Sequence, residues 1–229
     1  MKTNVVVTVK SWNIANFKRL KGQYPDFDWV LITDKDELTK EKLEELDPEY
    51  VFFTHWAWII KEDIYENFNC VVFHMTDLPF GRGGSPLQNL ISRGIEKTKL
   101  SAIKVVGGID AGPIYMKVPL DLNGSAEEIY KRASDIVYGL IPRIAKEKPE
   151  PKEQEGEVIE FKRRTPDMSK IPMDGSLEKV YDWIRMLDAE GYPPAFIDYG
   201  YFRLIFKKAR KEGGTVRAEV VFERRDEDE

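Results

Sequence analysis

The two histidines are the side chains of this sequence best suited to move protons near neutral pH. His74 ends an apolar run (CVVFH), and His55 directly follows another (YVFFTHW), so both stand where a buried strand gives way to a loop. In open parallel sheets, ligands bind beyond the carboxyl ends of the strands. Either histidine could therefore act as a general acid or base on a bound substrate. His55 could equally serve only to hold its loop, because Trp56 and Trp58 stand beside it.

A glycine-rich loop, FGRGGSP at residues 80–86, follows His74. Glycines let a backbone approach a ligand closely. A helix that starts at Pro86, with Ser85 as its N-cap, would point its free N–H groups at the same space. Arg82 adds a fixed charge with a forked set of donors. The GK[ST] ending of a phosphate-binding loop is absent, and a tight turn that packs backbone on backbone is the alternative.

Asp110 is the second candidate for proton transfer, and it stands in the turn GGIDAGP. An aspartate among glycines is most often a turn-former. This turn follows the strand that we expect beside the strand of His74. A carboxylate there could orient the imidazole or accept a proton from an incoming nucleophile.

The elements that must position these residues alternate between short apolar runs and helical stretches. This alternation predicts βαβ units and a parallel sheet, whose strands are buried on both faces and therefore read as continuous apolar runs. Thr39 is placed to cap the helix after it. Pro142 should kink or end the helix that runs from residue 125 to residue 145. The predicted strands are residues 4–9, 29–33, 50–53, 70–73, 100–106 and 114–118, and a further helix is predicted at residues 86–95.

The composition changes at residues 146–156 (KEKPEPKEQEG), which we interpret as a linker. Beyond it, Ser176 is placed to cap a helix, and residues 201–206 and 215–222 flank the turn KEGG as a predicted hairpin. We therefore predict an α/β protein with a Rossmann-like, mostly parallel sheet and a smaller C-terminal α+β subdomain. The predicted domains are residues 1–149 and 150–229.

Composition excludes several functions. The net charge of −5 argues against general nucleic-acid binding, which needs a basic face. The sequence has no apolar run of the roughly 20 residues that span a bilayer. One cysteine, Cys70, and two histidines do not make a thiolate or multi-histidine zinc site. We thus expect no metal, nucleic-acid or membrane partner and, without an export signal, a cytoplasmic location.

Taken in order, these motifs resemble those of the folate-dependent formyltransferases. The resemblance covers residues 1–145 and consists of a strand that ends in His74, a Leu78-Pro79 pair, the loop at residues 81–86, and a D-x-G that begins with Asp110. The separation from His74 to Asp110 is 110 − 74 = 36 residues. The resemblance implies a Rossmann-like domain, 10-formyltetrahydrofolate as formyl donor, a primary amine as acceptor, and His74 and Asp110 as catalytic residues.

Two later segments, residues 161–169 (FKRRTPDMS) and 181–196, resemble the sugar-nucleotide N-formyltransferases, and FFTHWAWII is similar to the pseudaminic-acid branch. That likeness implies a nucleotide-linked amino sugar as substrate, best matched by UDP-4-amino-4,6-dideoxy-N-acetyl-L-altrosamine, in surface glycan biosynthesis. Methionyl-tRNA formyltransferases carry a larger, basic C-terminal domain, for which this chain looks too short and too acidic. The alternatives are formylation of another amine, on a dTDP-amino sugar or a peptide, and a non-catalytic nucleotide-sugar-binding protein.

One position departs from the family. The family usually has Asn two residues before the histidine, where this chain has Val72. The amide would donate to the oxyanion of the reaction, and losing such a donor costs about 2.7–4 kcal/mol. His74 with a backbone N–H, or the amide of Gln88 or Asn89, would have to replace it.

The resemblance also implies residues that bind the two substrates. The basic run at residues 162–164 could contact a diphosphate or be only a solvated strand end. Trp56 could pack against the flat ring of the donor or in the core. The aromatic run at residues 199–206 could form a homodimer contact or pack on the helix near Tyr181. The predicted donor-binding residues are Phe80, Gly81, Arg82, Gly83, Val105, Gly107 and Trp56, and the predicted substrate-binding residues are Lys10, Trp12, Asn13, Thr76, Arg163 and Arg164.

Overall fold

The computed structural model describes residues 2–173 and 175–225 of the chain, which fold as two compact units built from alternating segments. Unit 1 consists of residues 2–82, 99–120 and 131–160. Unit 2 consists of residues 83–98, 121–130 and the described residues from Phe161 onward. The predicted boundary between domains at residues 149 and 150 stays a prediction.

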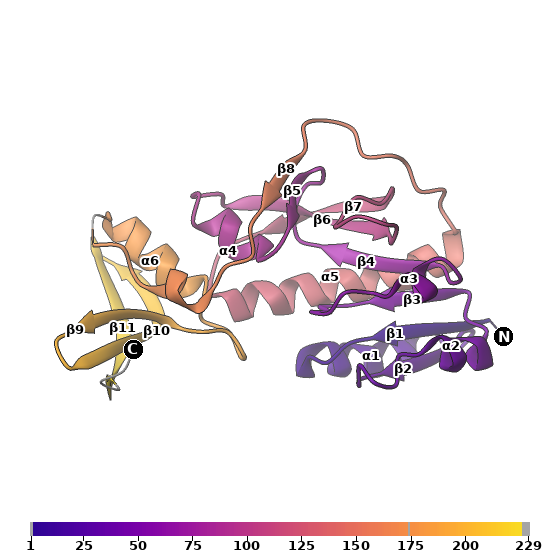
Figure 1. Ribbon diagram of the computed structural model, residues 1–229, viewed down its shortest axis with the longest axis horizontal. Helices are drawn as coiled ribbons and strands as arrows, with labels where there is room; N and C mark the ends of the chain where they lie inside the picture. The colour runs from indigo at the N-terminus through magenta and orange to yellow at the C-terminus, as the bar shows by residue number, and fades with distance from the viewer. Residues whose placement is uncertain (1, 174, 226–229) are drawn as a thin grey trace. The chain divides into compact units, whose positions relative to one another are not determined.

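A six-stranded sheet has the order β2-β1-β3-β4-β6-β7 (Figure 1). β1 pairs in parallel with β2 and β3, and β3 pairs in parallel with β4, whereas β6 runs antiparallel to β4. The sheet is dominated by parallel pairs, which confirms the predicted fold class. Its strands are β1 (Thr3–Val7), β2 (Asp28–Ile32), β3 (Tyr50–Phe53), β4 (Cys70–His74), β6 (Lys97–Lys104) and β7 (Ile114–Asp121).

Helices cover both faces of the parallel part of this sheet. The connections from β1 to β2 and from β2 to β3 cross the sheet in opposite directions, so right-handed crossovers place α1 (Ser11–Gln23) and α2 (Lys40–Leu46) on opposite faces. On the α2 face, Leu43 and Ile64 of α3 (Glu62–Tyr65) join the apolar side chains of β1 and β3 in one buried cluster. The predicted cap of α2 is confirmed, because the Thr39 hydroxyl accepts the backbone N–H of Lys42 at 3.1 Å.

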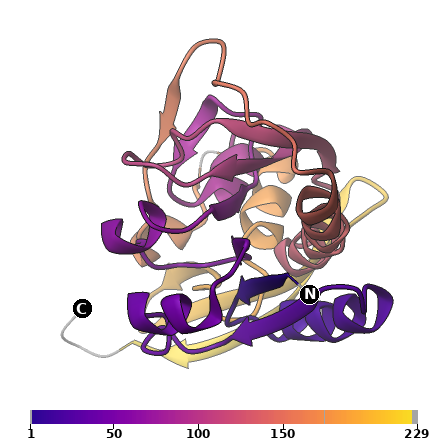
Figure 2. The ribbon, with the colours of Figure 1, turned by 90° about the vertical axis from the view of Figure 1, so that its right-hand side faces the viewer.

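The long helix α5 (Ala126–Glu147) continues past Pro142, so the prediction that it could end there is wrong. Proline inside a helix costs about 3 kcal/mol. Ile141 and Ile144 on either side of Pro142 are fully buried, and burying each such side chain stabilises the fold by about 1.5–3 kcal/mol. The free energy gained by burying Ile141 and Ile144 therefore outweighs the cost of keeping Pro142 in the helix. Figure 2 shows this helix nearly end-on.

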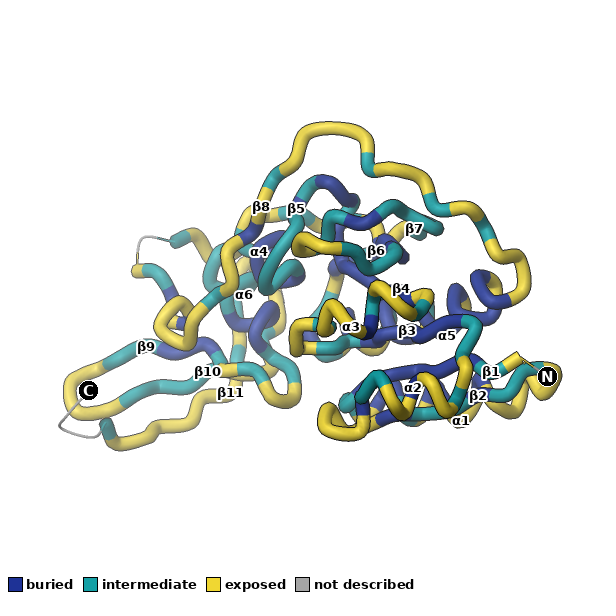
Figure 3. The backbone as a smooth tube through the Cα atoms, turned by 45° about the vertical axis from the view of Figure 1, so that its right-hand side comes forward, coloured by how far each residue is buried: buried dark blue, intermediate teal, exposed yellow. Residues whose placement is uncertain are grey.

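Unit 2 carries an antiparallel sheet of β9 (Ala195–Tyr199), β10 (Phe202–Glu212) and β11 (Thr215–Arg224), and β10 and β11 form the predicted hairpin. The predicted cap of α6 (Leu177–Arg185) is confirmed, because the Ser176 hydroxyl accepts the backbone N–H of Lys179. Figure 3 shows that the central strands β1, β3 and β4 of unit 1 are largely buried, whereas much of the hairpin is exposed.

The start of α4 (Pro86–Ile91) differs from the prediction. Ser85 has a φ of +50° and does not cap the helix with its side chain. Its hydroxyl instead accepts the backbone N–H of Arg164 at 3.1 Å. Ser85 and Arg164 follow two short strands that pair with each other, β5 (Phe80–Gly83) and β8 (Ile159–Phe161). A tertiary partner has thus replaced the local one.

A single-turn helix, η1, covers Pro166–Ser169. No helix in the described residues is both long and apolar enough to cross a membrane.

The protein's own side chains fill the crevice between the carboxyl ends of β1 and β3, where the strand order reverses and open sheets usually bind ligands. The Thr8 hydroxyl donates to the Thr54 carbonyl at 2.8 Å. The Asn13 amide donates to the Thr8 hydroxyl at 3.0 Å and to the Thr54 carbonyl at 3.2 Å. Above them, the rings of Trp12 and His55 meet edge to face, 5.6 Å apart.

His55 is held as a neutral imidazole in this crevice. Burial, together with the nearby charge of Lys10, lowers the pKa of His55 to about 4. Its φ of +51° lies in the left-handed region. The structure therefore gives His55 a packing role next to Trp12, which agrees with the alternative that it holds its loop.

We expect the lowered pKa of His55 to make the fold sensitive to acid. Above the ordinary histidine pKa of about 6.5, His55 is neutral in both states and contributes nothing. As the pH falls toward 4, the unfolded chain takes up a proton that the native state refuses, so stability is lost. Asn also tolerates the left-handed backbone, so His55→Asn removes the titrating group without straining the chain. Between about pH 7 and about pH 4.5, the free energy of unfolding of this variant should fall by about 2 kcal/mol less than that of the wild type. Urea unfolding at the two pH values measures this difference, and equal losses would contradict it.

Candidate active site

His74 is buried at the end of β4 with an acceptor at each ring nitrogen. Its Nε2 donates to the Gly81 carbonyl oxygen at 2.7 Å, and its Nδ1 lies 3.4 Å from Oδ2 of Asp110. A carbonyl can only accept, so Nε2 carries a proton. A carboxylate also only accepts, so the ring satisfies both neighbours when both nitrogens are protonated. The arrangement suits an imidazolium that faces a carboxylate, which is one of the roles predicted for Asp110.

Asp110 reaches His74 only because its loop folds back along the sheet. β6 is antiparallel to β4, and the Val105 N–H donates to the Cys70 carbonyl at 2.9 Å, which is at the opposite end of β4 from His74. The loop uses unusual backbone positions. Asp110 has a φ of +50°, and a Cβ at Gly112 would lie 1.7 Å from the carbonyl oxygen of Lys104. The D-x-G pattern is therefore a requirement of backbone packing as well as of chemistry.

Gln154 is the residue of this site that sequence reasoning missed. Its Nε2 donates to the carbonyls of Asp110 and Gly112, each at 2.8 Å. Its Oε1 accepts from Nε and Nη2 of Arg82 at 3.1 and 2.8 Å. Gln154 lies in the charged segment predicted to be a linker, and nothing in the pattern KEKPEPKEQEG marks it out.

Thr76 lies beneath the loop that carries Gly81. It is fully buried, and its hydroxyl donates to the Gly81 carbonyl at 3.3 Å, the same oxygen that accepts from His74. Its own carbonyl accepts the Ser101 hydroxyl at 2.7 Å. The structure thus uses Thr76 to hold the acceptor of His74 in place, and its predicted contact with substrate stays a prediction.

The glycines of unit 2 that follow this loop pack on neighbouring backbone. A Cβ at Gly83 would lie 2.4 Å from the Phe161 carbonyl oxygen, and one at Gly84 would lie 2.6 Å from Cβ of Arg163. The Gly84 N–H also donates to the Phe161 carbonyl at 3.1 Å. Close packing of backbone on backbone, the alternative considered from the sequence, describes these two glycines.

Two of the residues predicted to bind the donor, Trp56 and Val105, pack against the buried cluster of the α2 face. Val72, which was not among them, packs there too. At Gly107, an added Cβ would meet only the Tyr65 hydroxyl, at 3.8 Å. The space beside the Gly107 backbone is therefore open, and its predicted contact with the donor stays a prediction. Phe80 and Arg82 lie on β5.

Val72, where the family has Asn, packs against the apolar cluster of the α2 face.

The amides of Gln88 and Asn89, which were considered as replacements for the Asn amide, donate to other groups of unit 2. Gln88 donates to the Tyr130 hydroxyl and the Met186 carbonyl. Asn89 donates to the carbonyls of Gly84, Ser85 and Lys162.

The two arginines predicted to bind substrate differ in their surroundings. Arg164 donates to the Met168 carbonyl, and its guanidinium lies 5.2 Å from the centre of the Trp183 ring. Burial, with a smaller effect of Arg93, lowers the pKa of Arg164. Arg163 is exposed. Arg163 is therefore the better candidate for a contact with phosphate.

A basic hairpin lies in unit 2 at residues 202–225. It contains eight Lys and Arg residues and three Glu residues, a formal net charge of +5, whereas the whole chain carries −5. Most of these basic side chains are exposed. The argument from net charge against nucleic-acid binding failed to take account of this local concentration.

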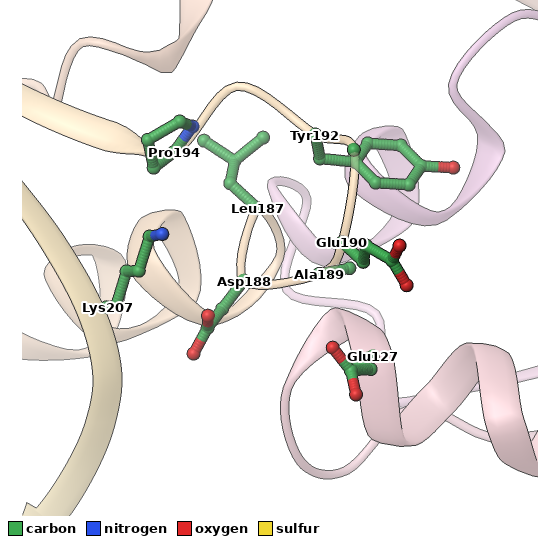
Figure 4. A pocket seen from close by; sticks show the side chains of 9 residues that line it. Glu127, Leu187, Asp188, Ala189, Glu190, Tyr192, Pro194 and Lys207 are labelled. Carbon is green, nitrogen blue, oxygen red and sulfur yellow. The ribbon is translucent and has the colours of Figure 1, made fainter. Parts of the chain in front are cut away.

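Unit 2 also holds a cavity of about 390 Å³ (Figure 4). Acidic side chains of Glu127, Asp188 and Glu190 gather around it with Lys207. The Asp188 carboxylate accepts the backbone N–H of Lys208 at 2.8 Å and so ties this loop to β10. None of the predicted site residues lines this cavity.

Other chemistry has little support among the described residues. Burial raises the pKa of the Cys70 thiol to about 12, so a nucleophilic thiolate is not available there. The described part of the chain contains no group of three His, Cys, Asp or Glu side chains that could hold a metal ion.

Comparisons with known proteins identify a family. A family model described as "Methionyl-tRNA formyltransferase, C-terminal domain" matches residues 166–223. The solved structure of a methionyl-tRNA formyltransferase from Clostridium thermocellum is 54% identical, has a TM-score of 0.96, and aligns over 98% of this chain and 100% of that one. A methionyl-tRNA formyltransferase of Clostridium beijerinckii is 24% identical over 86% of this chain and 68% of its own length. The chain spans between about half and two thirds of the curated relatives that it matches.

HypX of Aquifex aeolicus in complex with tetrahydrofolic acid shares the fold, with a TM-score of 0.72 at 12% identity over 92% of this chain and 39% of that one. The formyltransferase family uses 10-formyltetrahydrofolate, which confirms the predicted donor. The prediction of a folate-dependent formyltransferase is confirmed as well.

The predicted sugar-nucleotide branch is wrong, and so are the pseudaminic-acid pathway, the sugar-nucleotide partner and the exclusion of nucleic acid. The C-terminal family model and the relatives from both Clostridium species overturn them. The prediction failed because it compared length and net charge with larger relatives, and neither quantity describes the local basic surface of the hairpin. The chain belongs to the methionyl-tRNA formyltransferase family.

Proposed function

We propose that the protein transfers the formyl group of 10-formyltetrahydrofolate to the amino group of methionyl-tRNA, and that it acts in the cytoplasm. The 54% identity to the Clostridium thermocellum protein over nearly the whole chain carries the choice of substrate. The contact between His74 and Asp110 supports the chemistry, because it brings a base and an acid together in a buried place.

Asp110 is the proposed acceptor of the amine proton. An amine attacks a carbonyl only when it is neutral, and 10-formyltetrahydrofolate supplies the activated formyl group. A carboxylate can take a proton from the amine as the new C–N bond forms. The side chain of Asp110 is 16% exposed, so part of the carboxylate remains accessible to a substrate.

His74 is the proposed acid and electrostatic partner. Its Nε2–H, which donates to the Gly81 carbonyl in this structure, would leave that carbonyl to donate to the formyl oxygen and stabilise the negative charge that develops there. The same proton can pass to the nitrogen that leaves the formyl carbon. Since Val72 cannot donate, His74 carries this role in place of an amide.

The basic hairpin and the exposed Arg163 are the proposed contacts with the tRNA backbone. Lys and Arg side chains that neutralise phosphates release counterions and bind without regard to sequence. The family model at residues 166–223 covers most of the hairpin, which supports a role shared with the C-terminal domains of its relatives.

Two substitutions test the catalytic pair. His74→Ala removes the acid, and Asp110→Asn keeps the size of the side chain but can no longer accept the amine proton. Each should lower kcat/KM for methionyl-tRNA by about 10²–10⁴-fold, measured as formyl-methionyl-tRNA by mass spectrometry after hydrolysis. Circular dichroism should show an unchanged fold. A His74→Ala enzyme with wild-type turnover would contradict the assignment.

A charge-removing pair tests the hairpin. Arg210 stands directly opposite Arg217, and like charges in that position repel. Arg217 also pairs with Glu212, but this ion pair is exposed and contributes about 0–1 kcal/mol. Arg210→Ala/Arg217→Ala should therefore change the stability of the fold little. The KM for methionyl-tRNA should rise about tenfold at low salt, and the slope of log affinity against log salt should weaken by about 2. The KM for the folate should not change. Lys40→Ala/Lys42→Ala on α2 removes the same charge elsewhere, and an equal effect from that control would contradict a specific surface.

A further inference from the structure

We infer that Gln154 is a positioning residue that holds Asp110 against His74 and couples this contact to Arg82. The inference rests on the proposed function for its catalytic meaning, but its structural part can be measured independently. All the residues that carry it belong to unit 1.

The segment around Gln154 is attached on one side to the start of β7 and on the other to the turn before β5. Lys152 and Ile114 exchange backbone hydrogen bonds, N–H to O, at 2.6 and 2.9 Å. Further along, the Ile159 N–H donates to the Pro79 carbonyl at 3.4 Å. The segment predicted to be a linker is thus a strap, with Gln154 held between two fixed points.

The hydrogen bonds of Gln154 specify the orientation of its amide. Oxygen faces the guanidinium of Arg82, and nitrogen faces the carbonyls of Asp110 and Gly112. Exchanging the two ends would set an NH₂ group against a cation and an oxygen against two carbonyls. Every arm of the amide has a complementary partner, so the group joins Arg82 to the Asp110 loop rigidly.

The loop needs such a contact. Residues 105–113 fold back from the end of β6, and Asp110 takes a left-handed backbone conformation that only a supported loop retains. A carboxylate 3.4 Å from the imidazole has little tolerance for displacement. A displacement of about 1 Å in a catalytic group can cost about 100-fold in rate.

Two substitutions separate the two arms of the amide. Gln154→Glu still accepts from Arg82 but cannot donate to the loop carbonyls. Gln154→Met keeps the length and loses both arms. We expect both variants to lose about 10–100-fold in kcat, whereas the KM for 10-formyltetrahydrofolate should rise only in Gln154→Met. Glu155→Gln, an exposed neighbour, is the matched control and should behave as the wild type.

A spectroscopic measurement tests the structural part without activity. The chain has two histidines, so ring ¹H–¹³C spectra contain two sets of signals. The His74 signals should shift in Gln154→Met and Gln154→Glu as the carboxylate moves, while those of His55 stay in place. Unmoved His74 signals or wild-type kcat in Gln154→Met would overturn the inference. Failure of the wild type to formylate methionyl-tRNA would refute only the proposed function, since the spectra would still test the contact.

Discussion

Asp110 reaches the imidazole of His74 because residues 105–113 return along the sheet from the end of β6. That return constrains much of unit 1. Gly112 must lack a side chain to pass the Lys104 carbonyl, and the Gln154 amide must hold two carbonyls of the loop. On the other side of the ring, Thr76 fixes the Gly81 carbonyl that accepts from Nε2. The histidine is therefore oriented from both sides by groups whose own places depend on distant parts of the chain.

The position of this pair differs from the usual ligand site of an open sheet. The point where strand order reverses lies between β1 and β3, and there the Thr54 carbonyl accepts from the side chains of Thr8 and Asn13. The pair lies instead where the sheet changes from parallel to antiparallel, between β4 and β6. Because β6 is antiparallel to β4, it ends beside Val71, and the loop after it must fold back to reach His74 at the other end of β4.

Charge in this protein is distributed unevenly. A net charge of −5 coexists with a hairpin of formal charge +5. Electrostatic attraction to a polyanion depends on charges within about a Debye length, which is about 8–10 Å at ordinary salt. The local surface therefore matters more than the sum over the chain, and the net charge was a poor guide to the partner.

Local patterns in the sequence were sufficient to predict the parallel strands, the caps at Thr39 and Ser176, and the pairing of His74 with Asp110. Each of these depends on neighbours along the chain or on a motif of fixed spacing. Pro142 within α5, the tertiary bond of Ser85 and the role of Gln154 could not be predicted in this way. They depend on burial and on hydrogen-bond partners that are 42 to 79 residues away along the chain. The residues around Pro142, Ser85 and Gln154 do not specify which distant groups these three will meet, so only the folded chain decides it.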